Sequence, residues 1–197
     1  MVLPNVFNLN IPARVPEDYK GLKIQAPGML SDMFKSIGAV PVMYPPGEWY
    51  TSVEKKLIDG IAVGITGIPM YNLQEMVKYH IEPTGDSLGL TGTSFIMNRR
   101  KYESFPPEVR KVIDDSVLWA SDRLIEIEVE NIPRQAEICK KAGNTFISLT
   151  PVEMMKWYIT IRPLHKQWIR RMEAMGLPGK KVYDEAKRLA EEYRSKK

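Results

Sequence analysis

Three side chains capable of acid–base chemistry lie close together in the first third of the chain: Glu48, Tyr50 and Asp59. Carboxylates and phenols can exchange protons with a bound substrate, so the group allows the hypothesis of a small-molecule enzyme or enzyme subunit. A structural interpretation is simpler. Asp59 precedes Gly60 in a predicted turn, and Glu48 begins a predicted helix, where a carboxylate suits the helix dipole. A strongly shifted pKa at one of these groups would favour the enzyme.

Other reactive side chains are few. The single cysteine, Cys139, excludes an internal disulfide and a cysteine-rich metal site, and its helical context predicts a small buried hydrophobe. His80 and His165 are far apart and lack metal-ligand spacing, so both are predicted to be structural. The glycines of residues 60–67 match neither a dinucleotide fingerprint nor a Walker loop. We therefore predict no catalytic residue, no metal site and no cofactor.

The elements that position these residues are three short apolar strands and two helices. The strands are predicted at Leu22–Gln25, Val40–Tyr44 and Ile61–Ile65, and the helices at Met29–Ile37 and Glu48–Ile58. This alternation implies parallel strands joined by right-handed crossovers. Ligands of open parallel sheets bind outside the carboxyl ends of the strands. Three loops follow those ends: Gln25–Gly28, Tyr44–Gly47 and Val63–Gly67.

The rest of the chain is predicted to be mostly helical. After a strand at Thr91–Met97, an apolar period near 3.5 runs from Glu108 to Ala142, interrupted only by Pro133. A strand at Thr145–Leu149 and two more helices follow. We divide the chain into an α/β ligand-binding lobe (1–97), a long interlobe helix (98–145) and a C-terminal strand and helices that pack back on the lobes (146–197).

Bulk composition is that of an ordinary globular protein. The 197 residues are 44% hydrophobic and 26% charged, and no run approaches the roughly 18 apolar residues of a membrane helix. Residues 1–16 lack the basic and unbroken apolar regions of a secretory signal. Residues 162–197 hold eleven Lys and Arg against five Asp and Glu. This excess could indicate a nucleic-acid surface, but alternating signs favour a solvated helix face, and we predict no nucleic-acid partner.

Several motifs resemble one protein family. The run Pro16–Ile24 resembles the entry to the second lobe of solute-binding proteins from tripartite ATP-independent periplasmic (TRAP) transporters, the DctP-like family. Further matching segments follow in the family's order: Gly38–Val42, Glu48–Tyr50, Asp59–Gly60, Met97–Tyr102, Phe105–Val109 and Gly176–Gly179. The resemblance implies an α/β, periplasmic-binding-protein-like lobe with a small βαβαβ sheet, a long interlobe helix and C-terminal helices. Family members carry a further N-terminal lobe of on the order of 120 residues, which this chain is expected to lack.

The same resemblance implies a function and a site. The chain would belong to a periplasmic receptor that captures a small organic solute between two lobes and delivers it to TRAP membrane permease subunits. Where the family places a carboxylate-gripping arginine, an aromatic platform and an asparagine, this sequence has Gln25, Pro46 and Val63. We predict a ligand site of Gln25, Pro46, Tyr50, Val63 and Gly64, suited to an organic acid or to a more neutral or apolar analogue.

Two further expectations concern the apparent missing lobe. Without it, the interlobe helix and residues 154–168 would expose apolar faces too large for a stable monomer. We therefore expect self-association, as a homodimer or by exchange of C-terminal helices. For the substitutions at Gln25, Pro46 and Val63, the alternative to a changed ligand preference is a truncated or decayed gene product whose site is no longer maintained.

Overall fold

The computed structural model describes residues 2–4, 6–84, 88–92 and 94–195. The strands are β1 (Val2–Pro4), β2 (Val6–Leu9), β3 (Lys23–Gln25), β4 (Val40–Val42), β5 (Gly60–Val63), β6 (Tyr79–Glu82), β7 (Leu90–Gly92) and β8 (Thr145–Ser148). The α-helices are α1 (Gly28–Ser36), α2 (Trp49–Glu54), α3 (Gly67–Met70), α4 (Arg99–Glu103), α5 (Pro107–Lys141), α6 (Pro151–Ala174) and α7 (Gly179–Ser195). Short 3-10 helices form η1 (Pro16–Tyr19), η2 (Pro46–Glu48) and η3 (Leu73–Glu75).

A six-stranded sheet in the order β4-β3-β5-β2-β6-β8 organises the fold. The predicted parallel unit is confirmed, because β3 runs parallel to both β4 and β5. The sheet is larger than the predicted unit, however. Strand β2 lies in its centre, antiparallel to β5 and β6, and all four of its residues are buried. Strand β8 extends the sheet parallel to β6, while β1 and β7 form a separate antiparallel ribbon.

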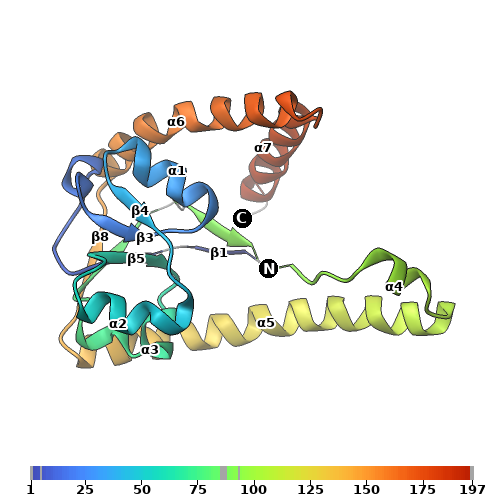
Figure 1. The fold of residues 1–197 in the computed structure, drawn as a ribbon, viewed down its shortest axis with the longest axis horizontal. Coiled ribbons are helices and arrows are strands. Elements are labelled where there is room, and N and C mark those ends of the chain that lie inside the picture. The colour runs from blue at the N-terminus through green and yellow to red at the C-terminus, as the bar shows by residue number, and fades with distance from the viewer. Residues whose placement is uncertain (1, 5, 85–87, 93, 196–197) are drawn as a thin grey trace.

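Helices cover both faces of the sheet and create two cores (Figure 1). Alternate side chains of each strand point to opposite faces, so Phe7 of β2 belongs to one core and Val6 to the other. The first core receives α1 and α6, and the second receives α2, α3 and the C-terminal part of α5. The result is a three-layer α/β/α arrangement.

Aromatic side chains fill the first core. Trp157 of α6 is fully buried, its ring centroid lies 5.1 Å from Tyr19 and 5.5 Å from Phe7, and Phe34 of α1 lies 5.0 Å from Phe7. The indole N–H of Trp157 donates to the Arg14 carbonyl at 3.0 Å. These contacts fasten the first turns of α6 to the sheet.

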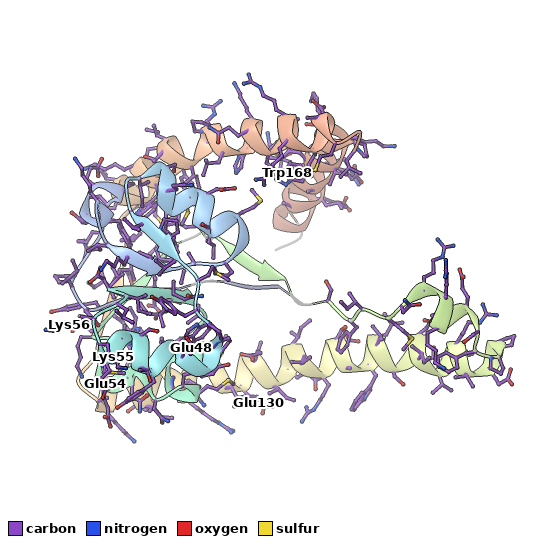
Figure 2. The ribbon with its side chains drawn as sticks, in the orientation of Figure 1. Glu48, Glu54, Lys55, Lys56, Glu130 and Trp168 are labelled. Atoms are coloured by element: carbon purple, nitrogen blue, oxygen red, sulfur yellow. The ribbon has the colours of Figure 1, made fainter. Side chains whose placement is uncertain are left out.

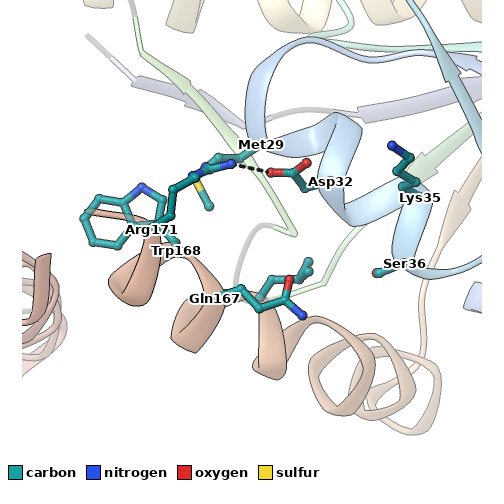
Figure 3. A pocket seen from close by; sticks show the side chains of 8 residues that line it. Met29, Asp32, Lys35, Ser36, Gln167, Trp168 and Arg171 are labelled. Carbon is teal, nitrogen blue, oxygen red and sulfur yellow. Dashed lines mark hydrogen bonds and ion pairs between the residues drawn. The ribbon is translucent and has the colours of Figure 1, made fainter. Parts of the chain in front are cut away.

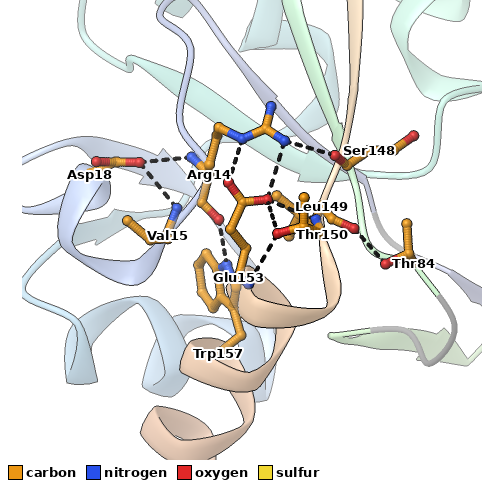
Figure 4. A network of polar contacts seen from close by, with 9 residues as sticks. All are labelled: Arg14, Val15, Asp18, Thr84, Ser148, Leu149, Thr150, Glu153 and Trp157. Atoms are coloured by element: carbon orange, nitrogen blue, oxygen red, sulfur yellow. Dashed lines mark hydrogen bonds and ion pairs between the residues drawn. The ribbon is translucent and has the colours of Figure 1, made fainter.

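A polar network at the start of α6 adds a second attachment (Figure 4). Thr150 and Glu153 form a reciprocal capping box. The Glu153 carboxylate also pairs with the Arg14 guanidinium, which reaches it through both Nε and Nη2. Arg14 Nη2 donates to the Ser148 carbonyl at 3.0 Å. The network joins the loop before η1 to the β8–α6 junction.

Helices α5 and α6 continue well beyond the sheet on the same side (Figure 1). The 35 residues of α5 form one helix that continues through Pro133, and α4 lies beside its far end, where the Tyr102 hydroxyl hydrogen-bonds Asp114. Large apolar side chains on this projecting part are exposed, including Leu118 (67%) and Trp119 (69%). Helix α7 folds back from α6 and carries i,i+4 ion pairs such as Lys180–Asp184.

Several sequence-based boundaries are wrong in detail. The helix predicted to Ile58 ends at Glu54, because the chain must turn through Lys56, at a positive φ of 56°, to enter β5. The strand predicted at Val40–Tyr44 ends at Val42, as β4. The strand predicted over residues 91–97 ends at Gly92, and its position 93 lies outside the described residues. The division at residues 97 and 145 stays a prediction.

Candidate functional site

The parallel strands bring the three predicted loops to one edge of the sheet. In the register, Gln25 at the end of β3 pairs with Val42 at the end of β4 and with Ile61 of β5. Figure 2 places Glu48 at the end of α2 on the side toward which α5 and α6 extend, with Lys55 and Lys56 at the opposite end. The loops after β3, β4 and β5 therefore lie at the edge of the sheet from which α5 and α6 project (Figure 1).

Gln25 lies at this edge but is occupied by the protein itself. Its side chain is 3% exposed, and its Oε1 accepts a hydrogen bond from the Tyr44 backbone N–H at 2.7 Å. Its Nε2 lies 3.7 Å from Met43 Sδ. The Tyr44 carbonyl in turn accepts from the Trp49 indole N–H at 3.0 Å. Gln25 and Trp49 thus hold the loop after β4 from both sides of one residue.

The other predicted site residues are more open. Pro46 begins η2 and is exposed, and Tyr50 of α2 is 39% exposed. Val63 and Gly64, at the end of β5, are half-buried. The structure thus places Gln25, Val63 and Gly64 at the strand ends and Pro46 and Tyr50 on the helical segment that follows β4.

Sequence reasoning missed three residues that shape this edge. Met43 is 66% exposed beside Gln25 and presents an apolar thioether at the end of β4. Trp49 packs edge-on against Tyr71, with ring centroids 4.8 Å apart. A run of aromatic residues and prolines after a strand was the available signal. The three loops contain no Lys or Arg, so this edge offers aromatic and apolar surface together with backbone groups.

The possible acid–base residues are not gathered into one site. The Asp59 carboxylate accepts a hydrogen bond from Lys23 N at 2.8 Å, which places it at the amino end of β3, opposite the candidate loops. Glu48 is exposed at the start of α2, as predicted for a helix-terminal carboxylate. Within the described ranges, no group of three or more His, Cys, Asp and Glu side chains is arranged to hold a metal ion.

A hollow between α1 and α6 lies next to the first loop. One cavity of about 460 Å³ is lined by Pro27 and Gly28, together with apolar side chains of both helices. A second cavity of about 460 Å³ adjoins it through Met29. The second is polar at one end, where Arg171 pairs with Asp32 at 3.3 Å (Figure 3). This hollow follows the α1 face of the sheet and was not predicted.

Comparison with known proteins identifies the family to which a chain with this fold and this sheet edge belongs. The model of the DctP family, bacterial extracellular solute-binding protein family 7, matches residues 5–171. The chain therefore belongs to the DctP family. None of the helices in the described part of the chain combines the length and apolarity needed to cross a membrane.

Individual relatives are similar over most of this chain. The C4-dicarboxylate-binding periplasmic protein DctP of Rhodobacter capsulatus is 27% identical over 174 residues, which cover 86% of this chain and 51% of the relative. The ectoine-binding periplasmic protein TeaA of Halomonas elongata is 26% identical over 74% of this chain and 42% of its own. The chain thus spans about half the length of the curated relatives it matches.

A solved structure extends the likeness to the fold. A marine metagenome TRAP solute-binding protein specific for aromatic acid ligands, crystallised with 3-hydroxybenzoate, superposes with a TM-score of 0.87 at 27% identity. The match covers 98% of this chain and 62% of that structure. The projecting helices are therefore part of the shared fold, and more than a third of the relative has no counterpart here.

Proposed function

We propose that this chain is the ligand-binding lobe of a TRAP-type receptor that captures a small organic solute without transforming it. The observation that carries the proposal is the family match over residues 5–171, combined with the parallel strand ends at the edge of the sheet from which α5 and α6 project. Membership of a periplasmic family supports a periplasmic location, and TRAP membrane permease subunits as the partner.

The solute proposed for this edge is aromatic or otherwise apolar on the side that meets the lobe. Three observations support it: the loops carry no cation, the Gln25 amide oxygen is already bonded to Tyr44, and Met43 and Tyr50 expose apolar surface. A carboxylate on the solute would have to be neutralised by groups outside these loops, because a buried unpaired charge is costly.

A two-dimensional NMR titration with 3-hydroxybenzoate tests the proposal. The expected result is saturable shifts of backbone amides in residues 25–28, 43–50 and 63–67. Tyr50→Ala should weaken this response at least several-fold, whereas Tyr183→Ala, on α7, should leave it unchanged. Shifts confined to the hollow between α1 and α6, or turnover of the compound, would contradict the proposal.

We also propose that the chain self-associates through its projecting helices. Leu118, Trp119 and Val129 of α5 and Ile159 of α6 are each at least 66% exposed, which is unusual for side chains of this size. Light scattering across micromolar concentrations should give a mass above that of one chain, and Leu118→Glu should reduce it. A concentration-independent monomer would contradict self-association and leave the solute proposal intact.

The enzyme alternative has no comparable support. Its three candidate groups are split between the carboxyl and amino ends of the parallel strands, as the Asp59–Lys23 contact indicates. The basic C-terminal helix likewise favours a solvated surface, since Lys180, Lys187 and Arg188 pair with acidic side chains of the same helix.

A further inference from the structure

Three buried polar side chains form a row on the face of the sheet that carries α5. Asn8 of β2 and His80 of β6 are fully buried, and Asn144, just before β8, is 8% exposed. The strand register sets Asn8 opposite His80. His80 Nδ1 lies 2.8 Å from Asn8 Oδ1, and His80 Nε2 lies 2.9 Å from Asn144 Oδ1.

The orientation of the Asn8 amide is fixed by its other contacts. Its Nδ2 donates toward three backbone carbonyls, those of Val6 at 2.9 Å, Ile61 at 3.0 Å and Val63 at 3.0 Å. Carbonyl oxygens only accept hydrogen bonds, so rotating the amide would set an oxygen against all three. The amide oxygen of Asn8 must therefore face His80.

The Asn144 amide also has its oxygen toward His80, but a single contact fixes this orientation. Its Nδ2 donates to the Gln74 carbonyl at 2.8 Å, which leaves its oxygen facing His80. Rotation of this amide would lose that one bond. The two amides thus present acceptors to both ring nitrogens, and Asn8 is the more firmly held of the two.

The proton count of the ring follows from these orientations. A neutral imidazole has one N–H, whereas an imidazolium has two. Only the imidazolium form of His80 can donate to Asn8 and Asn144 together. Burial lowers the pKa of His80, and the hydrogen bond to Asn144 raises it, with burial the larger effect. We therefore expect the second proton to bind only at a pH below about 6.5, the ordinary pKa of a histidine side chain.

Charged groups on the elements around His80 have other partners or lie in solvent. Strands β2 and β8 carry no charged residue. Lys78 directs its ammonium toward the carbonyls of Gln74 and Ala142, each at 3.4 Å. Lys140 of α5 lies over the Phe146 ring at 5.5 Å and lowers the pKa of Glu82, which burial raises. Glu75 of η3 is exposed.

We propose that His80 is a proton-operated clamp between the sheet and the junction of α5 with β8. In the neutral state the ring keeps its proton on Nδ1 and remains bonded to Asn8, because the Asn8 amide cannot turn without losing three bonds. The Asn144 link is then open. On acidification Nε2 gains a proton and bonds Asn144, which closes the clamp.

The position of the clamp gives it a structural consequence. Asn144 follows the last turn of α5, and its backbone N–H donates to Cys139 O at 3.0 Å. At the other end, Asn8 binds the carbonyls of Ile61 and Val63 in β5, and Val63 lies at the edge of the candidate ligand site. Closing the clamp fastens the base of the projecting helix α5 to the same network that holds β5.

Nitrogen-15 NMR of the two imidazole nitrogens of His80 tests the proposal directly. The expected result is a neutral form protonated at Nδ1, the less common tautomer, and an acidic transition at Nε2 below pH 6.5. The Asn144 side-chain amide and the Thr145 backbone amide should shift with the same midpoint, while the Asn8 side-chain amide stays constant. His165→Gln removes the only other histidine and makes the signal unambiguous.

Two variants separate the clamp from a merely structural histidine. Asn144→Ala should preserve the Nδ1–H tautomer and move the midpoint to lower pH, because it removes the bond that favours the second proton. Asn8→Ala should reverse the tautomer to Nε2–H. A neutral His80 protonated at Nε2 in the parent protein, or a His80 transition that leaves Asn144 unmoved, would overturn the proposal. No solute is involved, so this outcome is independent of the proposed function.

Discussion

The buried amide oxygen of Gln25 accepts a hydrogen bond from the backbone N–H of Tyr44, with 2.7 Å between the two atoms. The contact spans the ends of two parallel strands and fixes the start of the loop after β4. Family resemblance predicts a ligand-binding role at this position. In the structure, the Gln25 side chain instead binds the backbone of Tyr44, and so it shapes the edge that would receive the solute.

Replacement of Gln25 by a residue of similar size tests that bracing role. Gln25→Met removes the acceptor and leaves the Tyr44 N–H unsatisfied, so we expect a loss of about 1–3 kcal/mol in the free energy of unfolding. Urea denaturation measures it. The exposed Gln167→Met is the control and should change stability by less than about 0.5 kcal/mol. Equal stability of the two variants would mean that Gln25 does not brace the loop.

A substitution at Gly60 tests the central placement of β2. Strand β5 begins at Gly60, which packs against the backbone of β2. A Cβ added at Gly60 would lie 2.6 Å from the Asn8 carbonyl oxygen, closer than real Cβ contacts. We expect Gly60→Ala to destabilise the protein by about 1–3 kcal/mol, since the central strands would have to separate. Gly47→Ala, where a Cβ meets nothing within 4 Å, is the matched control. A smaller loss at position 60 than at 47 would contradict the central placement of β2.

Acid should weaken the attachment of α6. Hydrogen bonding from Arg14 and then Thr150 lowers the pKa of Glu153 to about 2. Because the folded-state pKa lies below the unfolded value, the contribution of Glu153 is present above about pH 4.5 and is lost as the pH falls toward 2. Thermal unfolding followed from pH 7 to 3 should show a smaller decline in Glu153→Gln than in the parent.

A control for this acid effect is available on α7. Arg188 lowers the pKa of Glu185, but that pair is about half exposed on a surface helix, where ion pairs contribute little. Glu185→Gln should therefore follow the parent curve. An identical decline in Glu153→Gln and in the parent would show that the α6 attachment does not titrate in this range.

The parallel unit could be predicted because each of its strands is a short apolar run bounded by Gly or Pro. Strand β2 could not, since Asn8 interrupts its apolar pattern at a buried position. Asn8 can be buried because its amide hydrogen-bonds Ile61, Val63 and His80. These partners lie 53 to 72 positions away in the sequence. Local periodicity carries no information about such partners, so the centre of the sheet was missed.

The candidate site also has features that the sequence could predict and features that it could not. The strand-end rule predicted that the three loops lie at one edge of the sheet, and they do, because this placement depends only on strand direction. The sequence could not predict that the Gln25 side chain is buried and bonded to Tyr44, because this bond depends on the register of β3 against β4. The exposure of Met43 likewise depends on where β4 ends, one residue before it.

Cys139 supplies a final test, of how the C-terminal part of α5 packs. Its thiol is fully buried in the second core, and burial raises its pKa to about 11. At pH 8 this shift reduces the reactive thiolate about 100-fold relative to an ordinary thiol, and burial blocks access as well. We expect a disulfide reagent to modify the folded protein at less than about 1% of its rate in denaturant. In a Cys139→Ala background, the exposed Ser116→Cys should react rapidly in the folded state. Comparable rates at the two positions would mean that α5 does not pack against the sheet at Cys139.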